Sequence, residues 1–178
     1  MASVKKKSSN FPCKVVELLR DFGGTKDLLL IAKSHRGVVI GPVHVENLFD
    51  DADIGEVVEG LTAFGYYNSG QDCTAACRVY ASDKIHDNLV ADLSSAVSKI
   101  KYDLPDDTQN EIGPLISGRQ RDRVASFVER ARELNHIEIT TGGRSQGENG
   151  FYYEPTVVAG AKQEDEIVQR EVFGPVVS

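Results

Sequence analysis

The chain has 178 residues, of which 40% are hydrophobic and 26% are charged, and its formal net charge is −7. This length corresponds to about one to one and a half globular domains with a buried core. The negative charge argues against a nucleic-acid binder, because a phosphate backbone needs many Lys and Arg side chains. No apolar run reaches the roughly 18 residues of a membrane-spanning helix, and residues 1–10 lack the apolar stretch of a secretory signal. We therefore expect a cytoplasmic protein whose partner is a small molecule or another subunit.

The charge of the chain is unevenly distributed. Residues 1–48 contain eight Lys or Arg and four Asp or Glu, whereas residues 49–178 contain twelve and twenty-three. This change predicts a boundary near Leu48, between a basic N-terminal segment at 1–48 and a domain at 49–178. Within the first segment, the pattern indicates short elements at 15–22 and 26–32 and a β-branched strand at 37–45.

Beyond Leu48, the first expected element is a helix. Asp50 or Asp51 caps it, and apolar residues recur at helical spacing until the helix ends near Gly65. Turn-forming residues fill 66–72, and residues 78–81 are expected as a short strand. The remaining elements are expected as a helix over 85–100, a loop over 103–118, a helix over 120–134, strands at 136–141 and 156–159 joined by an exposed crossover loop, and a C-terminal segment at 167–178. Because helices alternate with strands, the sequence predicts an α/β fold with a largely parallel sheet flanked by helices.

The chain has three cysteines, Cys13, Cys73 and Cys77. Their odd number and spacing match neither a disulfide framework nor a paired Cys-x2-Cys zinc site, so we expect reduced thiols. Cys73 is expected on a Gly-bearing turn between a helix and a strand, where main-chain amides would stabilise a thiolate and later an oxyanion. From the residues alone, a nucleophile and a small buried thiol both remain open for Cys73. No His or third Cys completes a metal set around Cys77, which is expected to pack in the interior.

Two motifs resemble those of a known family. Residues 64–78, FGYYNSGQDCTAACR, resemble the cysteine active-site signature of NAD(P)-dependent aldehyde dehydrogenases, in which Gly-Gln-x-Cys places the catalytic thiol. Residues 171–176, EVFGPV, resemble the segment of that family that binds the coenzyme. The resemblance extends from about Phe49 through Ser178, and it includes the sequences NEIGPL at 110–115 and TGG at 141–143. Within the family, it is strongest to gamma-aminobutyraldehyde dehydrogenases.

The resemblance implies NAD(P)-dependent oxidation of an aldehyde, such as the amino-aldehyde gamma-aminobutyraldehyde, to the carboxylic acid. Cys73 would attack the aldehyde carbon to give a thiohemiacetal, and the thioester left by hydride transfer would be hydrolysed by water. The main-chain amide of Cys73 would supply half of an oxyanion hole. In the family the other half comes from an asparagine of the coenzyme domain, and Asn68 is not that residue.

The resemblance also implies residues that bind the cofactor, NAD or NADP. Glu171 would hydrogen-bond the nicotinamide ribose, and Phe173 would pack beside the nicotinamide ring. Gln120 and Arg123 lie where family members carry polar side chains near the adenosine ribose.

The sequence departs from the family in its N-terminal part. The general-base glutamate of the family falls at Val39, and a valine cannot transfer a proton. Glu46 is seven residues further on, up to roughly 20 Å away along an extended chain, and is a poor substitute. No glycine-rich nucleotide-binding unit precedes Phe49. We therefore expect a partial catalytic domain that lacks the Rossmann-type coenzyme domain, and no NAD-dependent turnover by the chain alone.

Two other functional classes remain open. The chain could be a catalytically silent interaction module that uses an exposed sheet edge to join a longer family subunit. It could also be a thiol-dependent esterase, which keeps the nucleophile and needs no coenzyme. We expect self-association or pairing with a longer family subunit.

Overall fold

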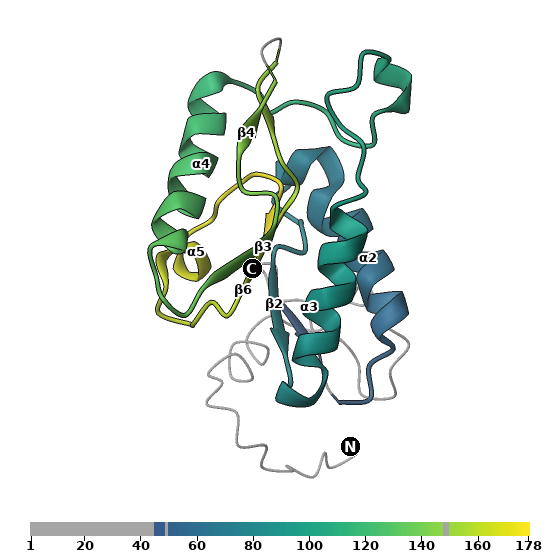
Figure 1. Cartoon of the computed structure of the whole chain (residues 1–178), viewed down its shortest axis with the longest axis vertical. Helices are drawn as coiled ribbons and strands as arrows, with labels where there is room; N and C mark the ends of the chain where they lie inside the picture. Colours follow the sequence, from purple (N-terminus) through teal and green to yellow (C-terminus); the bar gives the residue numbers. More distant parts are fainter. Residues whose placement is uncertain (1–44, 49, 148–149) are drawn as a thin grey trace, which may run out of the picture.

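The computed structural model describes residues 45–48, 50–147 and 150–178 (Figure 1). Cys13, Val39 and the elements expected before residue 45 lie outside the described residues. Strands run through the middle of the described part, with the helices α2 and α3 on one side and α4 and α5 on the other. The α/β class expected from the sequence is therefore confirmed.

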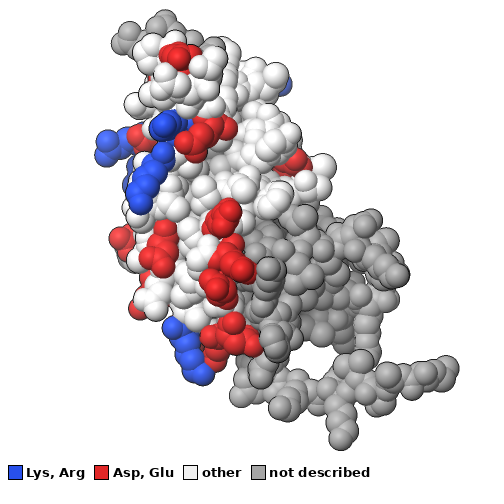
Figure 2. All heavy atoms as spheres, turned by 90° about the vertical axis from the view of Figure 1, so that its right-hand side faces the viewer, with Lys and Arg blue, Asp and Glu red and all other residues white. Residues whose placement is uncertain are grey.

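Helices α2 and α3 form one side of the molecule. Helix α2 spans Ile54–Tyr66 and begins at Asp53, whose carboxylate accepts a hydrogen bond of 3.2 Å from the amide of Glu56. The expected cap at Asp50 or Asp51 is wrong by two or three residues, because Asp53 is the carboxylate that reaches this free amide. Helix α3 spans Asp83–Val97. Figure 2 shows the outer face of this side, where acidic side chains outnumber basic ones.

Helices α4 and α5 form the other side. Helix α4 spans Gly118–Arg132 and is capped by the hydroxyl of Ser117, which accepts a hydrogen bond of 3.2 Å from the amide of Gln120. Helix α5, Glu166–Gln169, is a single turn that leads directly into the second motif. No helix within the described ranges has the length and hydrophobicity needed to span a bilayer.

The strands form a mixed sheet rather than a largely parallel one. They are β1 Val45–Leu48, β2 Arg78–Ala81, β3 Glu138–Thr141, β4 Ser145–Gln146, β5 Tyr152–Tyr153, β6 Thr156–Ala159 and β7 Val176–Val177. Strand β1 pairs parallel with β2, and β6 pairs parallel with β7, whereas β3 pairs antiparallel with β6. The main chain of Ser178 joins these groups, because its carbonyl accepts from the amide of Val79 at 2.8 Å and its amide donates to the carbonyl of Cys77 at 3.0 Å.

The connection between β3 and β6 differs from the expected crossover loop. Gly142 and Gly143 adopt φ values of +69° and +88°, which glycine accepts without steric cost. The chain continues past these glycines into β4 and reverses direction between β4 and β5, which form an antiparallel hairpin. The sequence expectation of a crossover was therefore wrong, and β3 and β6 run in opposite directions.

The core has two parts, one on each face of the sheet. Val157 of β6 and Val177 of β7 pack with the buried residues of α2 and α3. Their neighbours Val158 and Val176 pack with those of α4 and α5. This division follows from the two-residue period of a strand, which sends successive side chains to opposite faces.

Candidate active site

Cys73 lies on an exposed turn between a 3-10 helix, Tyr67–Gly70, and strand β2. The carboxylate of Asp72 fixes this turn, because its Oδ1 accepts hydrogen bonds of 2.6 Å from both the amide and the hydroxyl of Thr74. Within the described part of the chain, no group accepts a hydrogen bond from the Cys73 amide. The exposed thiol does not fit the alternative of a buried, space-filling cysteine.

Side chains before Cys73 attach this turn to the loop that precedes α4. Gln71 accepts a hydrogen bond of 2.9 Å from the amide of Ile116, and Ser69 donates one of 2.5 Å to the carbonyl of Gly113. Asn68 and Gln71 also bond to each other's carbonyl oxygens, at 3.0 and 3.3 Å. The sequence predicts a turn over these residues but not these contacts, because nothing in it indicates the distant partners.

The second motif lies directly against the cysteine turn. Gly70 has a φ of +67°, and a Cβ atom placed on it would lie 2.0 Å from the carbonyl oxygen of Gly174. A Cβ on Gly174 would in turn lie 2.4 Å from a methyl carbon of Val124 on α4. Gly174 is therefore packed between the cysteine turn and α4, and the two sequence motifs meet through main-chain contact that only glycine permits.

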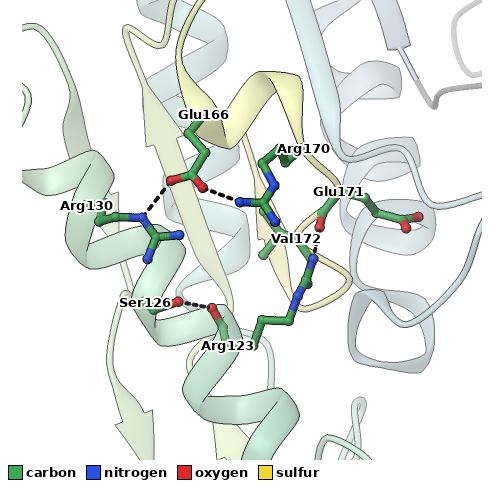
Figure 3. Close-up of polar contacts among 7 residues, drawn as sticks. All are labelled: Arg123, Ser126, Arg130, Glu166, Arg170, Glu171 and Val172. Atoms are coloured by element: carbon green, nitrogen blue, oxygen red, sulfur yellow. Dashed lines mark hydrogen bonds and ion pairs between the residues drawn. The ribbon is translucent and has the colours of Figure 1, made fainter.

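A small pocket lies between the two motifs. Its lining includes Gly70, Asp72 and Cys77 from the first motif, Glu171 and Phe173 from the second, and Arg170 directly before the second. Cys73 does not line this pocket, although it directly follows Asp72. Cys77 is half-buried, and the side chain of Glu171 is exposed and points away from the arginines of α4 and α5 (Figure 3).

Gln120 and Arg123 contact the main chain of the second motif. The side-chain amide of Gln120, through Nε2, donates a hydrogen bond of 2.8 Å to the carbonyl of Phe173. The guanidinium of Arg123 donates one of 2.7 Å to the carbonyl of Glu171 and another to the carbonyl of Val172 (Figure 3). The structure thus brings together Gln120, Arg123, Glu171 and Phe173, while a contact with the adenosine ribose stays a prediction.

The expected hydrolytic base is not part of this assembly. Val39, at the position of the family glutamate, lies outside the described residues. The main chain of Glu46 belongs to β1, where it is in register with Val79 of β2.

Comparisons with known proteins show similarity to aldehyde dehydrogenases. The chain is 35% identical over 127 residues to a mitochondrial aldehyde dehydrogenase of Leishmania tarentolae, covering 71% of this chain and 25% of that protein. It is 33% identical over 175 residues to betaine aldehyde dehydrogenase of Bacillus subtilis, covering 93% of this chain and 36% of that protein. The structure matches betaine aldehyde dehydrogenase of Staphylococcus aureus in complex with NAD+, with a TM-score of 0.70 and 34% identity over 77% of this chain and 28% of that one.

The chain therefore spans between 25% and 36% of the length of these relatives. The model of the aldehyde dehydrogenase family matches residues 44–178, a range that includes both motifs and every strand that the structure describes. This match and the shared fold show that the chain belongs to the aldehyde dehydrogenase family.

Proposed function

We propose that this chain is the nucleophile-bearing part of an NAD(P)-dependent aldehyde oxidoreductase, in which Cys73 attacks the substrate. The observation that carries this proposal is the main-chain contact between Gly70 and Gly174. This contact joins the turn that carries the exposed thiol to the segment that would bind the coenzyme, which supports the proposal.

The chemistry at Cys73 follows from its surroundings. The Cys73 sulfur adds to the aldehyde carbon and gives a thiohemiacetal, and the Cys73 amide hydrogen-bonds the developing oxyanion. When bound, NAD(P)+ accepts the hydride from this carbon. The thioester then left on Cys73 is hydrolysed by water, which releases the carboxylic acid and restores the thiol. The described residues supply the nucleophile and one oxyanion donor, but the base for hydrolysis is not among them.

The residues of the second motif fit one part of the coenzyme. The exposed carboxylate of Glu171 is suited to accept hydrogen bonds from ribose hydroxyls, and the half-buried ring of Phe173 offers an apolar face to the nicotinamide. Gln120 and Arg123 are assigned to the adenosine ribose by family position only. Among the described residues, no glycine-rich strand–turn–helix unit is present for the rest of a dinucleotide. The described residues alone therefore do not complete a coenzyme site.

The proposed substrate is an amino-aldehyde, such as gamma-aminobutyraldehyde. The pocket between the motifs does not argue for this substrate by its charge, because Arg78 and Arg170 line it together with Asp72 and Glu171. The support for an amino-aldehyde comes from the family resemblance. Among the relatives are enzymes named betaine aldehyde dehydrogenase and 2-aminomuconic 6-semialdehyde dehydrogenase. One solved relative carries a cysteine modified by BME. A reactive thiol in a relative supports the same role for Cys73.

The proposal extends to partners and compartment. The predicted boundary near Leu48 is moved to the start of β1, because β1 pairs with β2. The residues before β1 are assigned to a separate basic segment, and the rest to a module that pairs with itself or with a longer family subunit. The proposed compartment is the cytosol, where the free thiols of Cys73 and Cys77 would stay reduced.

Protection of Cys73 from alkylation tests the proposed function. Gamma-aminobutyraldehyde should slow the reaction of Cys73 with iodoacetamide, because the thiohemiacetal has no free thiol. A Cys77→Ala variant should show the same protection. Absence of protection would contradict the proposal and favour a non-catalytic interaction module. Release of nitrophenol from an activated ester at Cys73, without protection by the aldehyde, would favour a thiol esterase instead.

A further inference from the structure

A cluster of charged side chains joins α4 to α5, close to the second motif. Glu166 of α5 accepts a hydrogen bond of 2.6 Å from Nε of Arg130 on α4. Its other carboxylate oxygen accepts one of 2.7 Å from Arg170, the residue directly before Glu171. Figure 3 shows Glu166 between the two guanidinium groups. We call Arg130, Glu166 and Arg170 the α4–α5 clamp.

The arginines of this clamp rest on one buried aromatic ring. The guanidinium carbons of Arg130 and Arg170 lie 5.0 and 5.4 Å from the ring centre of Phe127, and that of Arg123 lies 4.9 Å from it. Phe127 is only 3% exposed, so the ring is a fixed support. An isolated surface ion pair contributes little, because holding two mobile side chains costs entropy. Here one carboxylate joins two guanidinium groups that the ring already orders, which reduces that cost.

The segment that follows the clamp has a strained main chain. Phe173 has a φ of +58°, in the left-handed region that non-glycine residues rarely adopt. Such a conformation persists only where the surroundings fix it. Arg123 and Gln120 hold the carbonyls of this segment from Glu171 onward. Before Glu171, the chain is held by the clamp and by a main-chain hydrogen bond of 2.9 Å from the amide of Arg170 to the carbonyl of Glu166.

We propose that Glu166 is a positioning residue, which holds Arg170 against α4 and thereby directs Glu171 and Phe173 toward the cysteine turn. The role of Glu171 and Phe173 in coenzyme binding rests on the proposed function. The effect of Glu166 on the position of these two residues does not. Glu166 touches neither substrate nor coenzyme in this proposal. It acts through Arg170 and the main chain that follows.

NMR spectroscopy of the full chain tests this proposal through two local signals. The first is the Nε–H signal of Arg130, which reports the hydrogen bond to Glu166. The second is the pair of methyl signals of Val172, a buried residue inside the segment. In Glu166→Gln, the Arg130 signal should shift upfield and the Val172 methyl signals should move toward their random-coil positions. The methyl signals of Val57, in the other part of the core, should stay unchanged.

Matched variants separate positioning from general stability. Glu164→Gln removes the same charge from an exposed residue nearby and should leave both signals in place. Glu166→Asp keeps the charge and should partly restore the Val172 signals. If Glu166→Gln does not fold, Arg130→Gln is measured instead. In that variant Glu166 keeps its hydrogen bond from Arg170 but loses the one from α4, and the Val172 methyl signals are the readout.

Unchanged Val172 signals in a folded Glu166→Gln variant would overturn the proposal. Equal shifts at Val57 and Val172 would also overturn it, because they would show a general structural role. Both readouts are made without aldehyde or coenzyme. Failure of the positioning proposal is therefore distinguishable from failure of the proposed function, which is decided by protection of Cys73.

Discussion

Cys73 and Cys77 are close in the chain but have different surroundings. Cys73 is exposed on a turn fixed by Asp72, whereas Cys77 is half-buried and its carbonyl accepts a hydrogen bond from Ser178. A thiol needs access to its reagent, and flanking main-chain amides favour the thiolate that reacts. The two cysteines should therefore differ in reactivity.

We expect Cys73 to react faster with iodoacetamide than Cys13 or Cys77 at neutral pH. The reason is the exposed turn, with an amide at Cys73 that no other described group uses. Peptide mapping after brief alkylation measures the three rates. Faster labelling of Cys13 or Cys77 than of Cys73 would contradict this expectation.

The contact between Gly70 and Gly174 is the second test at the residue scale. Gly70→Ala should lower the free energy of unfolding by about 2 kcal/mol or more, because the new Cβ meets main chain and φ is positive. Gly113→Ala is the matched control, since a Cβ there has nothing within 4 Å, and its effect should stay within about 0.5 kcal/mol. Urea unfolding measures both values, and equal losses in the two variants would contradict the contact.

The site residues could be assigned from the sequence only where a motif includes them. Cys73, Glu171 and Phe173 belong to such motifs, so the sequence alone is enough to predict a role for each. The contact of Gly70 with Gly174 could not be predicted in this way, because each glycine alone indicates only a turn or a close approach. Which main chain approaches which is decided by the tertiary fold.

At the scale of elements, the α4–α5 clamp makes stability depend on pH. The hydrogen bond from Arg130 lowers the pKa of Glu166 most strongly, and burial opposes it. The hydrogen bond from Arg170 and the charges of both arginines also lower this pKa, which therefore lies below its usual value. Protonation of Glu166 would remove the charge that joins the two arginines.

Asp165, at the start of α5, behaves similarly. Burial raises the pKa of Asp165, but the hydrogen bonds from the Lys162 amide and from His136, with the charges of both residues, together outweigh it and lower the pKa. His136 Nε2 lies 2.8 Å from the carboxylate of Asp165. The first turn of α5 is thus held by two carboxylates with lowered pKa values.

A carboxylate with a lowered folded-state pKa stabilises the fold above its unfolded-state pKa, and this contribution is lost as the pH falls through the folded-state pKa. We therefore expect the free energy of unfolding to decrease as the pH falls below about 4.5, the ordinary range of these groups. In Glu166→Gln, this decrease should be smaller than in the parent chain. Urea unfolding at several pH values between about 3 and 6 measures it. A Glu166→Gln variant with the same pH dependence as the parent would contradict the assignment.

The elements with clear periodicity were predicted best. Strands β2 and β6 lie where the sequence indicated, and the buried positions of α3, including Leu89 and Leu93, follow the expected helical spacing. The hairpin β4–β5 was missed because each of its strands has two residues, which is too short to show alternation. The antiparallel pairing of β3 with β6 depends on that hairpin, so it was missed as well.

At the scale of the whole molecule, apolar side chains are exposed beside the cysteine turn. The side chain of Ile116 is 81% exposed and that of Phe151 is 45% exposed. The two are neighbours, because the amide of Leu115 donates to the carbonyl of Phe151 at 3.0 Å. Exposed apolar surface of this kind favours association between proteins.

We expect the chain to self-associate at tens of micromolar, and the double variant Ile116→Ser, Phe151→Ser to do so less. Removing apolar surface from contact with water is the driving force for this association. Light scattering measures the average mass of both proteins. A single monomeric species of the parent chain at this concentration would contradict the expectation.

The central claim is that Cys73 is the residue that attacks an aldehyde. The most direct measurement is the 13C NMR spectrum of propanal labelled at its carbonyl carbon, mixed with the chain in excess. We predict a protein-dependent signal of a tetrahedral carbon bonded to sulfur, which is present in the parent chain and in Cys77→Ala but absent in Cys73→Ala. No such signal in the parent chain, or a signal that persists in Cys73→Ala, would contradict the claim.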